Sequence, residues 1–231
     1  MKFLHQKLLF CALILTLITS CGTSRLVSTP IENIDNTPIK FTELTETEEK
    51  VWGHLDFISD TIPGMSINKA YDELIKNKKG TKVIVAVIDS GVDIDHEDLD
   101  DVIWTNKGEI PNNNKDDDNN GYVDDIYGYD FYNNDANPMD DHYHGTHCAG
   151  TIGAVGDNGI GVTGVCWDGR IMAVKFLNSG GSGNTADAID SVEYATLMGA
   201  HVMSNSWGGG SYSQGLKDAI DAAGAAGVAF V

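Results

Sequence analysis

The sequence predicts an α/β fold, a doubly wound and mostly parallel sheet with helices on both of its faces. Short apolar runs rich in β-branched residues alternate with helical segments, which is the pattern of strand–helix–strand units. The run KVIVAVIDSG at 82–91 includes six consecutive apolar residues, as expected for a strand buried on both faces of a parallel sheet. With 231 residues, of which 42% are hydrophobic, the chain is long enough to bury one sizeable core.

The N-terminal residues predict a targeting segment followed by a tether. Lys2 and Lys7 precede the apolar run LLFCALILTLI, which is short for a membrane span, and small residues lead from it to Cys21. Residues 1–21 resemble a bacterial lipoprotein signal, in which Cys21 would be diacylated and would anchor the protein to a membrane of the cell envelope. A cleaved signal of a secreted protein is the alternative. Residues 22–50 are polar and have no hydrophobic period, so we expect a tether there.

A short helix and a long irregular stretch are predicted on either side of the buried strand. Residues 66–80 predict an amphipathic helix, because Ala70, Leu74 and Ile75 share one face of it. Residues 105–142 are rich in Asn and Asp and have no period. That stretch is too long for a plain connection, which predicts a functional or ion-stabilised loop.

The second half of the chain predicts alternating helices and strands. GTHCAGTIGA at 145–154 consists of small residues, as expected for a helix packed closely against its neighbours, and RIMAVKFL at 170–177 is a second apolar strand. We further expect a strand at 201–210 that enters a glycine turn, a helix at 213–227, and a last strand that begins at Val228.

The helix predicted at 184–200 has the clearest boundaries. Asn184 or Thr185 can cap its first turn, and Gly199 can end it. The residues expected to form its inner stripe are Ala188, Ile189, Val192 and Leu197. No internal repeat interrupts this order of elements, which supports a single doubly wound sheet.

The charge of the chain argues against nucleic acid as a partner. The formal net charge is −19 and the pI is about 4.4, so a phosphate backbone would be repelled. Such a balance is typical of a secreted protein or of one that binds cations. Much of the charge is equally consistent with a solvated acidic surface.

Asp89 and His144 are the candidate catalytic residues. Asp89 ends the buried strand at the carboxyl edge of the sheet, where its desolvation is costly unless a partner binds it. His144 opens a helix of small residues and can reach inward. A histidine beside a buried aspartate is held in one tautomer, and its protonated form is stabilised. The two residues therefore predict the Asp–His half of an acyl-transfer triad.

Three histidines at H-x-H-x-x-H spacing also raise the possibility of a metal site. The metallo-hydrolase motif with a similar spacing uses a carboxylate where this chain has Thr146. The segment after His144 also predicts a packed helix rather than a free loop. We therefore expect one histidine to be a base, His142 to face solvent, and His147 to pack beneath the site with one hydrogen bond.

Two segments carry a resemblance to a known family. VIVAVIDSGVDIDHEDL and HGTHCAGTIGA resemble the aspartate and histidine boxes of the subtilisin-like serine proteases, peptidase family S8, in its thermitase-like branch. GVTGV, IMAVKFLN and VMSNSWGG are similar to the blocks that follow. The resemblance implies that 51–231 is a subtilisin-like catalytic domain that hydrolyses peptide bonds of polypeptides. Asp89 would orient the histidine, and His144 would act as general base and then as general acid.

The same resemblance implies how a substrate is held. The SNSWGG segment is similar to the strand that lines the specificity pocket of the family. There Ser206, Trp207 and Gly208 would pair with the backbone of the substrate as an added strand. The size of Trp207 leaves the shape of that pocket open.

The nucleophile implied by the resemblance is not found. It would lie in a GTS-type box after the strand that begins at Val228, whereas the only such triplet is Gly22–Ser24. We therefore expect a partial catalytic domain whose C-terminal part is missing, active as a serine endopeptidase when complete and inactive as it stands. The alternative is a non-catalytic, calcium-binding surface lipoprotein built on an inactive protease fold.

Two acidic stretches are candidate structural calcium sites. DDDNNGYVDD at 116–125 offers oxygen ligands at alternating positions, although Tyr127 stands where an EF-hand has its bidentate glutamate. An Asx-rich solvated turn is an equally good interpretation of that stretch. The candidate ligands in it are the side chains of Asp116, Asp118, Asn120 and Asp124.

The second stretch, DFYNNDANPMD at 130–140, resembles the calcium loop of the thermitase branch. The resemblance implies side-chain ligation by Asp130 and Asp135 and carbonyl ligation by Asn137 and Met139. Hard oxygen ligands with excess negative charge favour Ca²⁺ over softer metals.

Cys148 and Cys166 are the two cysteines outside the signal segment. Both stand among small apolar residues, and either a disulfide or two free buried thiols is consistent with the sequence. Cys148 follows His144 by one helical turn and resembles the cysteine of thiol-bearing subtilases. We do not expect it to be a nucleophile, because burial raises the pKa of a thiol.

Overall fold

The computed structural model describes residues 43–76, 78 and 80–231. These residues belong to one unit, Lys40–Val231, which is separate from a first unit, Met1–Ile39. The predicted lipoprotein signal with Cys21, and most of the predicted tether, lie outside the described residues. Within the described residues, the helices are all too short or too polar to span a membrane.

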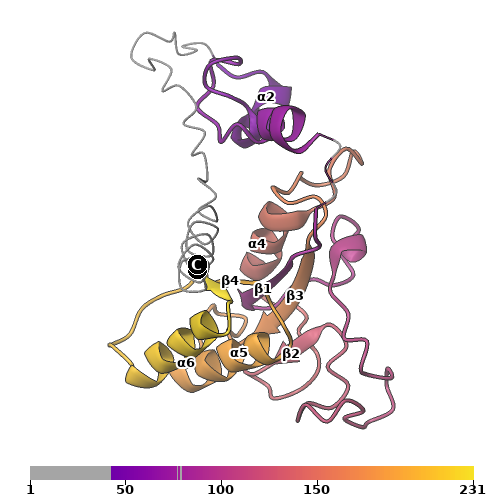
Figure 1. Ribbon diagram of the computed structural model, residues 1–231, viewed down its shortest axis with the longest axis vertical. Coiled ribbons are helices and arrows are strands. Elements are labelled where there is room, and N and C mark those ends of the chain that lie inside the picture. The colour runs from indigo at the N-terminus through magenta and orange to yellow at the C-terminus, as the bar shows by residue number, and fades with distance from the viewer. Residues whose placement is uncertain (1–42, 77, 79) are drawn as a thin grey trace, which may run out of the picture. The chain divides into compact units, whose positions relative to one another are not determined.

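A five-stranded sheet in the order β2-β3-β1-β4-β5 forms the centre of the unit (Figure 1). Every neighbouring pair of strands is parallel, because helices and long loops connect them. The strands are β1 (Ile84–Asp89), β2 (Gly128–Asp130), β3 (Arg170–Lys175), β4 (Val202–Ser204) and β5 (Ala229–Phe230). Four of the five match predicted strands and are shorter than expected, whereas β2 lies inside the stretch predicted to be irregular.

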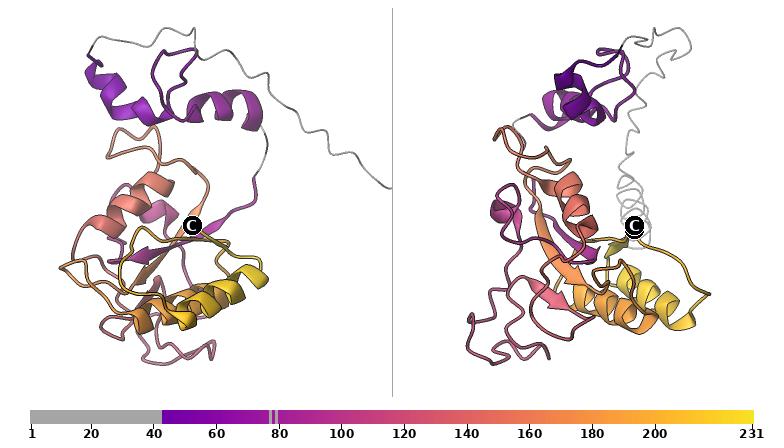
Figure 2. Two further views of the ribbon diagram at one scale, coloured as in Figure 1. Left: turned by 90° about the vertical axis from the view of Figure 1, so that its left-hand side faces the viewer. Right: turned by 180° about the vertical axis from the view of Figure 1, so that it is seen from behind.

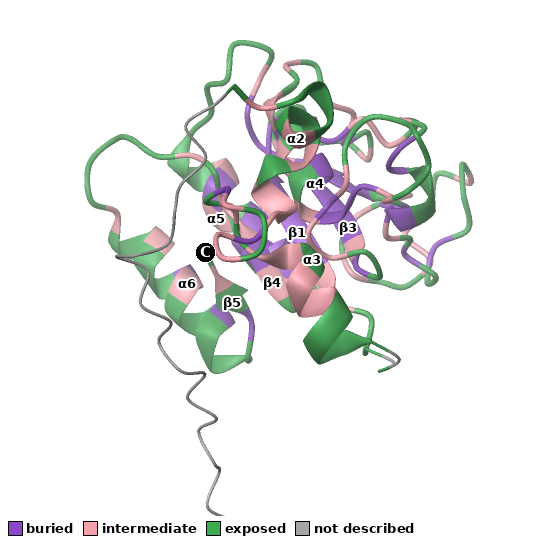
Figure 3. Cartoon of the chain, turned by 90° about the horizontal axis from the view of Figure 1, so that it is seen from above, coloured by how far each residue is buried: buried purple, intermediate pink, exposed green. Residues whose placement is uncertain are grey.

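Helices cover both faces of this sheet, as the predicted doubly wound fold requires. Helix α4 (His144–Gly153) lies on one side of the strands, while α5 (Thr185–Leu197) and α6 (Gln214–Ala225) lie on the other (Figures 1 and 2). Alternate residues of β1 supply the two cores, with Val87 facing α4 and Ile88 facing α5. Figure 3 shows the buried positions concentrated on the central strands and the exposed ones on the outer side of α6.

The segment before β1 contains more helix than the sequence predicts. Helix α2 (Glu46–Val51) begins inside the predicted tether, because Thr45 and Glu48 form a capping box that satisfies two free backbone N–H groups. It is followed by η2 (Trp52–His54), by α3 (Ile67–Ala70), and by the π-helical turn η3 (Tyr71–Ile75). A further short turn, η4 (Asp100–Val102), follows β1.

The amphipathic face predicted for 66–80 is wrong. Leu74 is 63% exposed, and the residue that packs is Tyr71, whose ring stacks on Trp167 at 3.9 Å. The Tyr71 hydroxyl also donates a hydrogen bond to the Val165 carbonyl. The segment is thus held to the loop after α4 by one aromatic pair, which a period of apolar residues does not reveal.

The prediction that Leu197 belongs to the inner stripe of α5 is also wrong. Leu197 is 61% exposed, whereas Ala188 and Val192 are buried as predicted. Nine residues turn an α-helix through about 900°, so Leu197 lies opposite Ala188. Near the end of the helix the fully buried residues are Tyr194 and Ala195.

Candidate active site

The side chains of Asp89 and His144 meet at the carboxyl end of β1. Asp89 is the last residue of that strand and is fully buried, and His144 is the first residue of α4. The imidazole Nδ1 lies 2.8 Å from Asp89 Oδ1 and 3.0 Å from Oδ2. The Ser90 N–H donates a further hydrogen bond of 2.7 Å to Oδ1. The structure therefore brings together the two residues that the sequence picks out as catalytic candidates.

This contact sets the proton positions on the imidazole. A carboxylate accepts hydrogen bonds only, so Nδ1 carries the proton and Nε2 keeps its lone pair. The His144 side chain is 40% exposed, and among the described residues no group hydrogen-bonds to Nε2. The pair can therefore accept a proton at Nε2, and the buried Asp89 then stabilises the imidazolium that forms.

Two glycines allow the helix to approach the strand this closely. A Cβ on Gly145 would lie 2.0 Å from the Gly91 carbonyl oxygen and 3.1 Å from Asp89 Cβ. Gly91 itself has φ +104°, and a Cβ there would lie 2.6 Å from the Pro138 carbonyl oxygen. Gly91, two residues after Asp89, and Gly145, directly after His144, are thus needed for the close contact between Asp89 and His144.

Replacing Gly145 by alanine is expected to separate Asp89 from His144, because a methyl group cannot occupy the space taken by the Gly91 carbonyl. The measurements are the melting temperature and the downfield NMR resonance of the His144 Nδ1 proton, which should fall and disappear respectively. Gly224→Ala in α6 is the matched control, since a Cβ there meets nothing within 4 Å. An unchanged Nδ1 resonance in Gly145→Ala would contradict this account.

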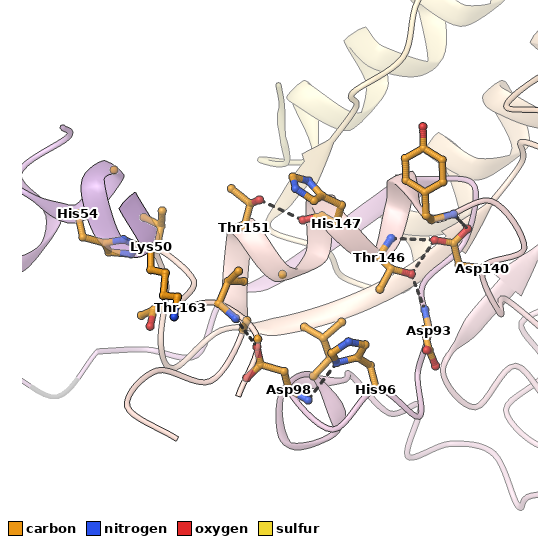
Figure 4. Close-up of a pocket in the computed structure, with 18 of the residues that line it drawn as sticks. Lys50, His54, Asp93, His96, Asp98, Asp140, Thr146, His147, Thr151 and Thr163 are labelled. Carbon is orange, nitrogen blue, oxygen red and sulfur yellow. Dashed lines mark hydrogen bonds between the residues drawn. The ribbon is translucent and has the colours of Figure 1, made fainter. Parts of the chain in front are cut away.

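Asp140 fixes the start of α4 relative to β1. Its carboxylate accepts hydrogen bonds from the Ser90 hydroxyl, from the N–H groups of His142, Tyr143 and Thr146, and from the Thr146 hydroxyl. Figure 4 shows the two from Thr146. Burial alone would raise the pKa of Asp140, but these hydrogen bonds outweigh it and lower the pKa. The carboxylate is thus kept ionised as an acceptor for the first turn of the helix.

The same network continues into the loops on either side. The Ser90 hydroxyl accepts a 3.0 Å hydrogen bond from the Gly145 N–H, and the Thr146 hydroxyl accepts a 2.9 Å hydrogen bond from the Asp93 N–H. Tyr143, directly before the histidine, has φ +120°, a strained value for a residue with a side chain. Several hydrogen bonds of this network therefore hold the backbone on both sides of His144 in one conformation.

Lys175 joins the end of β1 to the loop that precedes α4. It is the register partner of Asp89 on β3 and is 1% exposed. Its Nζ donates to the Ser90 carbonyl at 2.7 Å, to the Leu177 carbonyl at 2.8 Å, and to Asp141 Oδ1 at 2.6 Å. This role of Lys175 was not predicted, although a lysine inside the apolar run RIMAVKFL is a signal of it.

The expectations for the two neighbouring histidines are wrong. His142 is half-buried rather than solvent-facing, since its ring stacks on Tyr143 at 4.4 Å. Its Nδ1 atom is buried and has no hydrogen-bond partner. His147 is exposed rather than packed beneath the site, because it projects from the outer face of α4. Neither ring contacts Asp89, so His144 alone can act as the base of this pair.

The predicted substrate-binding residues lie just after β4. The strand ends at Ser204, so the SNSWGG segment leaves the sheet after its first residue. The Trp207 ring packs on Phe176 at 4.9 Å and on Phe230 at 6.5 Å, and therefore faces the core. Ser206 and Gly208 are exposed near the carboxyl end of the sheet. The Trp207 ring thus anchors the segment in the core, while Ser206 and Gly208 remain accessible to solvent.

Cys148 and Cys166 are free thiols, and each is half-buried. Cys148 Sγ lies 3.9 Å from His144 Nδ1. Burial raises the pKa of the Cys148 thiol, with a smaller opposing effect from the Ser206 hydroxyl. The thiol is therefore protonated at neutral pH, which agrees with the expectation that it is not a nucleophile.

The first acidic stretch brings one predicted carboxylate, Asp118, together with two that were not predicted, Glu109 and Asp125. Carboxylate oxygens of Glu109, Asp118 and Asp125 lie within 4.8 Å of one another. Asn120 joins them, since its amide donates to Asp125 Oδ2 at 3.0 Å. Burial raises the pKa of Asp125, whose carboxylate also accepts a hydrogen bond from the Tyr194 hydroxyl. Of the four predicted ligands, Asp118 and Asn120 belong to this cluster.

The other two predicted ligands of that stretch serve the backbone. Asp116 accepts hydrogen bonds from the N–H groups of Asn120 and Gly121, and Asp124 accepts them from Asn113 and Asn114. Their carboxylates therefore shape the turn, and an EF-hand-like arrangement of all four side chains is not formed.

The second acidic stretch forms a tight turn around Asp130. Asp130 is buried, and its carboxylate accepts hydrogen bonds from the N–H and the side-chain amide of Asn133. Its backbone pairs with that of Asp135, which is exposed. Burial raises the pKa of Asp130. Asn137 and Met139 follow in the same loop, so the four predicted ligands share one segment.

A cavity of about 980 Å³ runs along the outer face of α4. Its lining includes Trp52, His54 and Met65, as well as Tyr143, His147 and Thr151. Figure 4 shows His54 on one side and His147 and Thr151 on the other. Neither Asp89 nor His144 lines it, because the imidazole projects from a different side of the helix. The cavity is thus distinct from the site formed by Asp89 and His144.

The fold and the contact between Asp89 and His144 together indicate a class of protein. A parallel α/β sheet places a buried aspartate at the end of its first strand, against an imidazole at the start of a helix of small residues. This is the arrangement that orients the base of a hydrolytic triad. Residues 80–231 match Peptidase S8, the subtilase family, and the chain belongs to that family.

Two named sequence relatives support this assignment, and one solved structure is similar to the chain. Subtilisin-like protease 1 of Plasmodium falciparum is 41% identical over 150 residues, which cover 64% of this chain and 22% of the relative. The thermophilic serine proteinase of Bacillus sp. strain AK1 is 36% identical over 149 residues, covering 64% of this chain and 31% of the relative. The crystal structure of a cold-adapted subtilisin-like serine proteinase matches with 32% identity and a TM-score of 0.47, covering 64% of this chain and 44% of that one. This chain therefore spans less than half the length of these proteins.

Proposed function

We propose that the chain carries the Asp–His part of a serine endopeptidase of the subtilisin class, acting on polypeptides. The observation that carries this proposal is the 2.8 Å contact between His144 Nδ1 and the buried Asp89, which leaves Nε2 free. Membership of the subtilase family supports it.

In the proposed mechanism, His144 moves one proton from the nucleophile to the leaving group of the substrate. Nε2 takes the proton of a serine hydroxyl as its oxygen attacks the scissile carbonyl, and then gives it to the leaving amine. Asp89 holds Nδ1–H throughout and stabilises the imidazolium. Asp140 and Lys175 touch neither substrate nor imidazole, and they keep the two segments in register as positioning residues.

The nucleophile must come from residues other than those near the pair. Among the described residues, no serine hydroxyl hydrogen-bonds to His144 Nε2. The relatives named above are longer than the matched region. We propose that a serine in a longer form of this protein completes the triad, and that the exposed Ser206 and Gly208 help to hold the substrate backbone.

The test compares the 231-residue chain with a form continued through the next in-frame segment of its gene. The longer form should hydrolyse a fluorogenic peptide and react with a fluorophosphonate, and the 231-residue chain should do neither. A labelled serine in the shorter chain would contradict the proposed origin of the nucleophile. A longer form without hydrolysis would support the alternative of a non-catalytic surface protein.

We also propose that Ca²⁺ is a structural cofactor of the acidic loops. The donor set fits, because Glu109, Asp118 and Asp125 offer carboxylate oxygens within 4.8 Å of one another. Hard oxygen donors are the ligands that Ca²⁺ prefers, and a cation would offset the repulsion among these carboxylates, of which Glu109 and Asp125 are buried. Bound there, or beside Asp130, it would order the loop that leads to the histidine.

Removing calcium is therefore expected to lower the melting temperature of the protein. The measurement is thermal unfolding in low-calcium buffer with and without EDTA, followed by calcium titration. Asp118→Asn should reduce the effect of EDTA, and Asp218→Asn on the exposed side of α6 is the matched control. Equal melting temperatures with EDTA and with millimolar calcium would count against the site.

For the segment outside the described residues, we propose lipid anchoring through Cys21 to a bacterial membrane of the cell envelope. The apolar run and the small residues before Cys21 support this proposal. Secretion after cleavage of the same segment is the alternative. Metabolic labelling with a palmitate analogue should modify the wild-type protein and not Cys21→Ser.

A further inference from the structure

Two stacked aromatic rings form an exposed platform near the amino ends of the strands. The Tyr71 and Trp167 rings lie 3.9 Å apart, with their planes 13° from parallel. Trp167 is still 44% exposed, although Tyr71 covers one face of its indole. Trp167 comes three residues before Arg170, the first residue of β3, whereas Asp89 is the last residue of β1. The platform therefore lies at the opposite edge of the sheet from the contact between Asp89 and His144.

Hydrogen bonds hold the two rings of this platform in place. The Tyr71 hydroxyl donates to the Val165 carbonyl at 3.1 Å and accepts from the Trp167 backbone N–H at 3.1 Å. The indole Nε1–H of Trp167 donates to the Gly164 carbonyl at 2.8 Å. These bonds satisfy the polar atoms of both rings, so the surface that the indole leaves open is apolar and flat.

A cavity of about 570 Å³ borders the platform, and Asn68, Asp72 and Lys76 line it together with the two rings. These three residues are exposed and four positions apart, so they follow one side of α3 and η3. Among the described residues, none forms a hydrogen bond or an ion pair with their side chains. The neighbouring Lys69, in contrast, pairs with Asp56. The cavity thus presents an amide, a carboxylate and an ammonium group whose donors and acceptors are available to a ligand.

The backbone that carries these side chains has an unusual conformation. The η3 turn is π-helical, because the Lys76 N–H donates to the Tyr71 carbonyl at 2.7 Å. In a regular α-helix a residue five positions further on lies about 140° away around the axis, so the wider turn is needed to bring Lys76 to the cavity beside Tyr71. Lys76 also has φ +43°, a strained value for a residue with a side chain. Turns of this kind are rare and occur frequently at functional sites.

The groups around the cavity favour a neutral ligand. The charges of Asp72 and Lys76 offset each other, and Asn68 is uncharged. The net charge of −19 repels a ligand that carries phosphate. A flat apolar surface beside free donors and acceptors suits a ring with an apolar face and hydroxyl groups at its edge, which is the chemistry of a pyranose sugar. The cavity volume also falls within the range of about 300–1,000 Å³ that is typical of small-ligand sites.

We propose that the platform of Tyr71 and Trp167, with Asn68, Asp72 and Lys76, is a binding site for a neutral saccharide. A pyranose ring would stack on the open face of the indole, and its hydroxyl groups would hydrogen-bond to the three polar side chains. The inference goes beyond the proposed function and does not depend on it. A saccharide chain bound at this edge of the sheet would hold the protein on a glycan surface and leave the opposite edge accessible.

The first test is an NMR titration of the 231-residue chain with maltotetraose and with chitotetraose. The two sugars distinguish a glucan from an N-acetylated glycan as the source of the pyranose ring. The chain has four tryptophans, and the Trp167 indole N–H resonance is the one that disappears in Trp167→Ala. At least one of the sugars should shift this resonance, with saturation at millimolar concentration.

The polar side chains are tested by variants on the same short helical segment. Asp72→Ala should weaken sugar binding by about tenfold, and Asn68→Ala by about fivefold. Both residues are exposed, so the variants should fold as the wild type does, and circular dichroism verifies this. Glu73→Ala is the matched control, because Glu73 is exposed on the same turn and does not line this cavity.

The stacking surface is tested by isothermal titration of Trp167→Ala, which should lose sugar binding. Trp52→Ala is the matched control and should keep the wild-type affinity, because Trp52 is 53% exposed and lies outside this cavity. If Trp167→Ala is unstable, because its loss leaves Tyr71 without a stacking partner, the Asp72→Ala and Asn68→Ala results decide the question.

Three results would overturn the proposal. Neither sugar shifts the Trp167 resonance at millimolar concentration, or the affinity is the same in the wild type, Asp72→Ala and Asn68→Ala. The third is that adenosine, which stacks as well as a sugar does, binds more tightly than both sugars. In the longer form, saturating sugar should leave the hydrolysis of a short fluorogenic peptide unchanged. Sugar binding by a longer form that hydrolyses no peptide would refute the proposed function and retain this site.

Discussion

Replacing Asp89 by asparagine is expected to lower kcat for peptide hydrolysis by about 10⁴ in the longer form, with little change in KM. The asparagine amide can donate a hydrogen bond to Nδ1, which favours the tautomer that carries its proton on Nε2. That tautomer cannot accept a proton from a serine. The loss of the buried charge also removes the stabilisation of the imidazolium, so both effects act in the same direction.

The measurement is steady-state hydrolysis of a fluorogenic peptide, together with the His144 ring resonances in the 231-residue chain. The downfield Nδ1 proton should be present in the wild type and absent in the variant. Asp95→Asn is the matched control, because Asp95 is exposed six residues further along. Equal kcat values for the wild type and Asp89→Asn would show that the contact is structural and that another group activates the nucleophile.

The contact between Asp89 and His144 could be predicted because each residue stands at a recognisable boundary. Six apolar residues end at Asp89, and a helix of small residues begins at His144. Parallel strands place their carboxyl ends at one edge of the sheet, where the helix after β2 also begins. The alternation of strands and helices is therefore enough to predict that Asp89 and His144 lie at the same edge of the sheet.

The groups that hold the pair together could not be predicted in the same way. The Asp140 carboxylate accepts five hydrogen bonds from three segments. Whether it can reach these donors depends on the path of the loop before α4, which the sequence does not show. Lys175 acts on Ser90 only because β3 pairs with β1 in the register that sets it beside Asp89. A strand is visible in sequence, whereas its register is a property of the whole sheet.

The acidic loops show the same limit. Alternating Asp and Asn residues predicted Asp116 and Asp124 as ligands, but their carboxylates cap backbone N–H groups of the turn. The carboxylates that do converge include Glu109 and Asp125, which lie outside the alternating set. Short polar side chains satisfy the nearest backbone first, so spacing alone does not separate a ligand from a turn residue.

Replacing Lys175 by methionine is expected to destabilise the protein by about 2–4 kcal/mol and to weaken the Asp–His contact. Methionine keeps most of the volume of the side chain but donates no hydrogen bond. The carbonyls of Ser90 and Leu177 would then lose a buried donor, and Asp141 would lose its ion pair. The Asp141 side chain is 51% exposed, so water can solvate it, and most of the cost comes from the two carbonyls.

Chemical denaturation of the 231-residue chain measures the change in unfolding free energy. Lys217→Met is the matched control, because Lys217 pairs with Asp221 on the exposed side of α6 and its replacement should leave stability unchanged.

A positioning role of Lys175 predicts more than lost stability. Below its melting temperature, Lys175→Met should broaden the Nδ1 proton resonance, and Lys175→Arg should restore part of it. A variant that is less stable but keeps the wild-type Nδ1 resonance would reduce Lys175 to a purely structural residue. Because Ser90 directly follows Asp89, we expect the resonance to change, since the backbone that Lys175 holds is the backbone that aims the carboxylate.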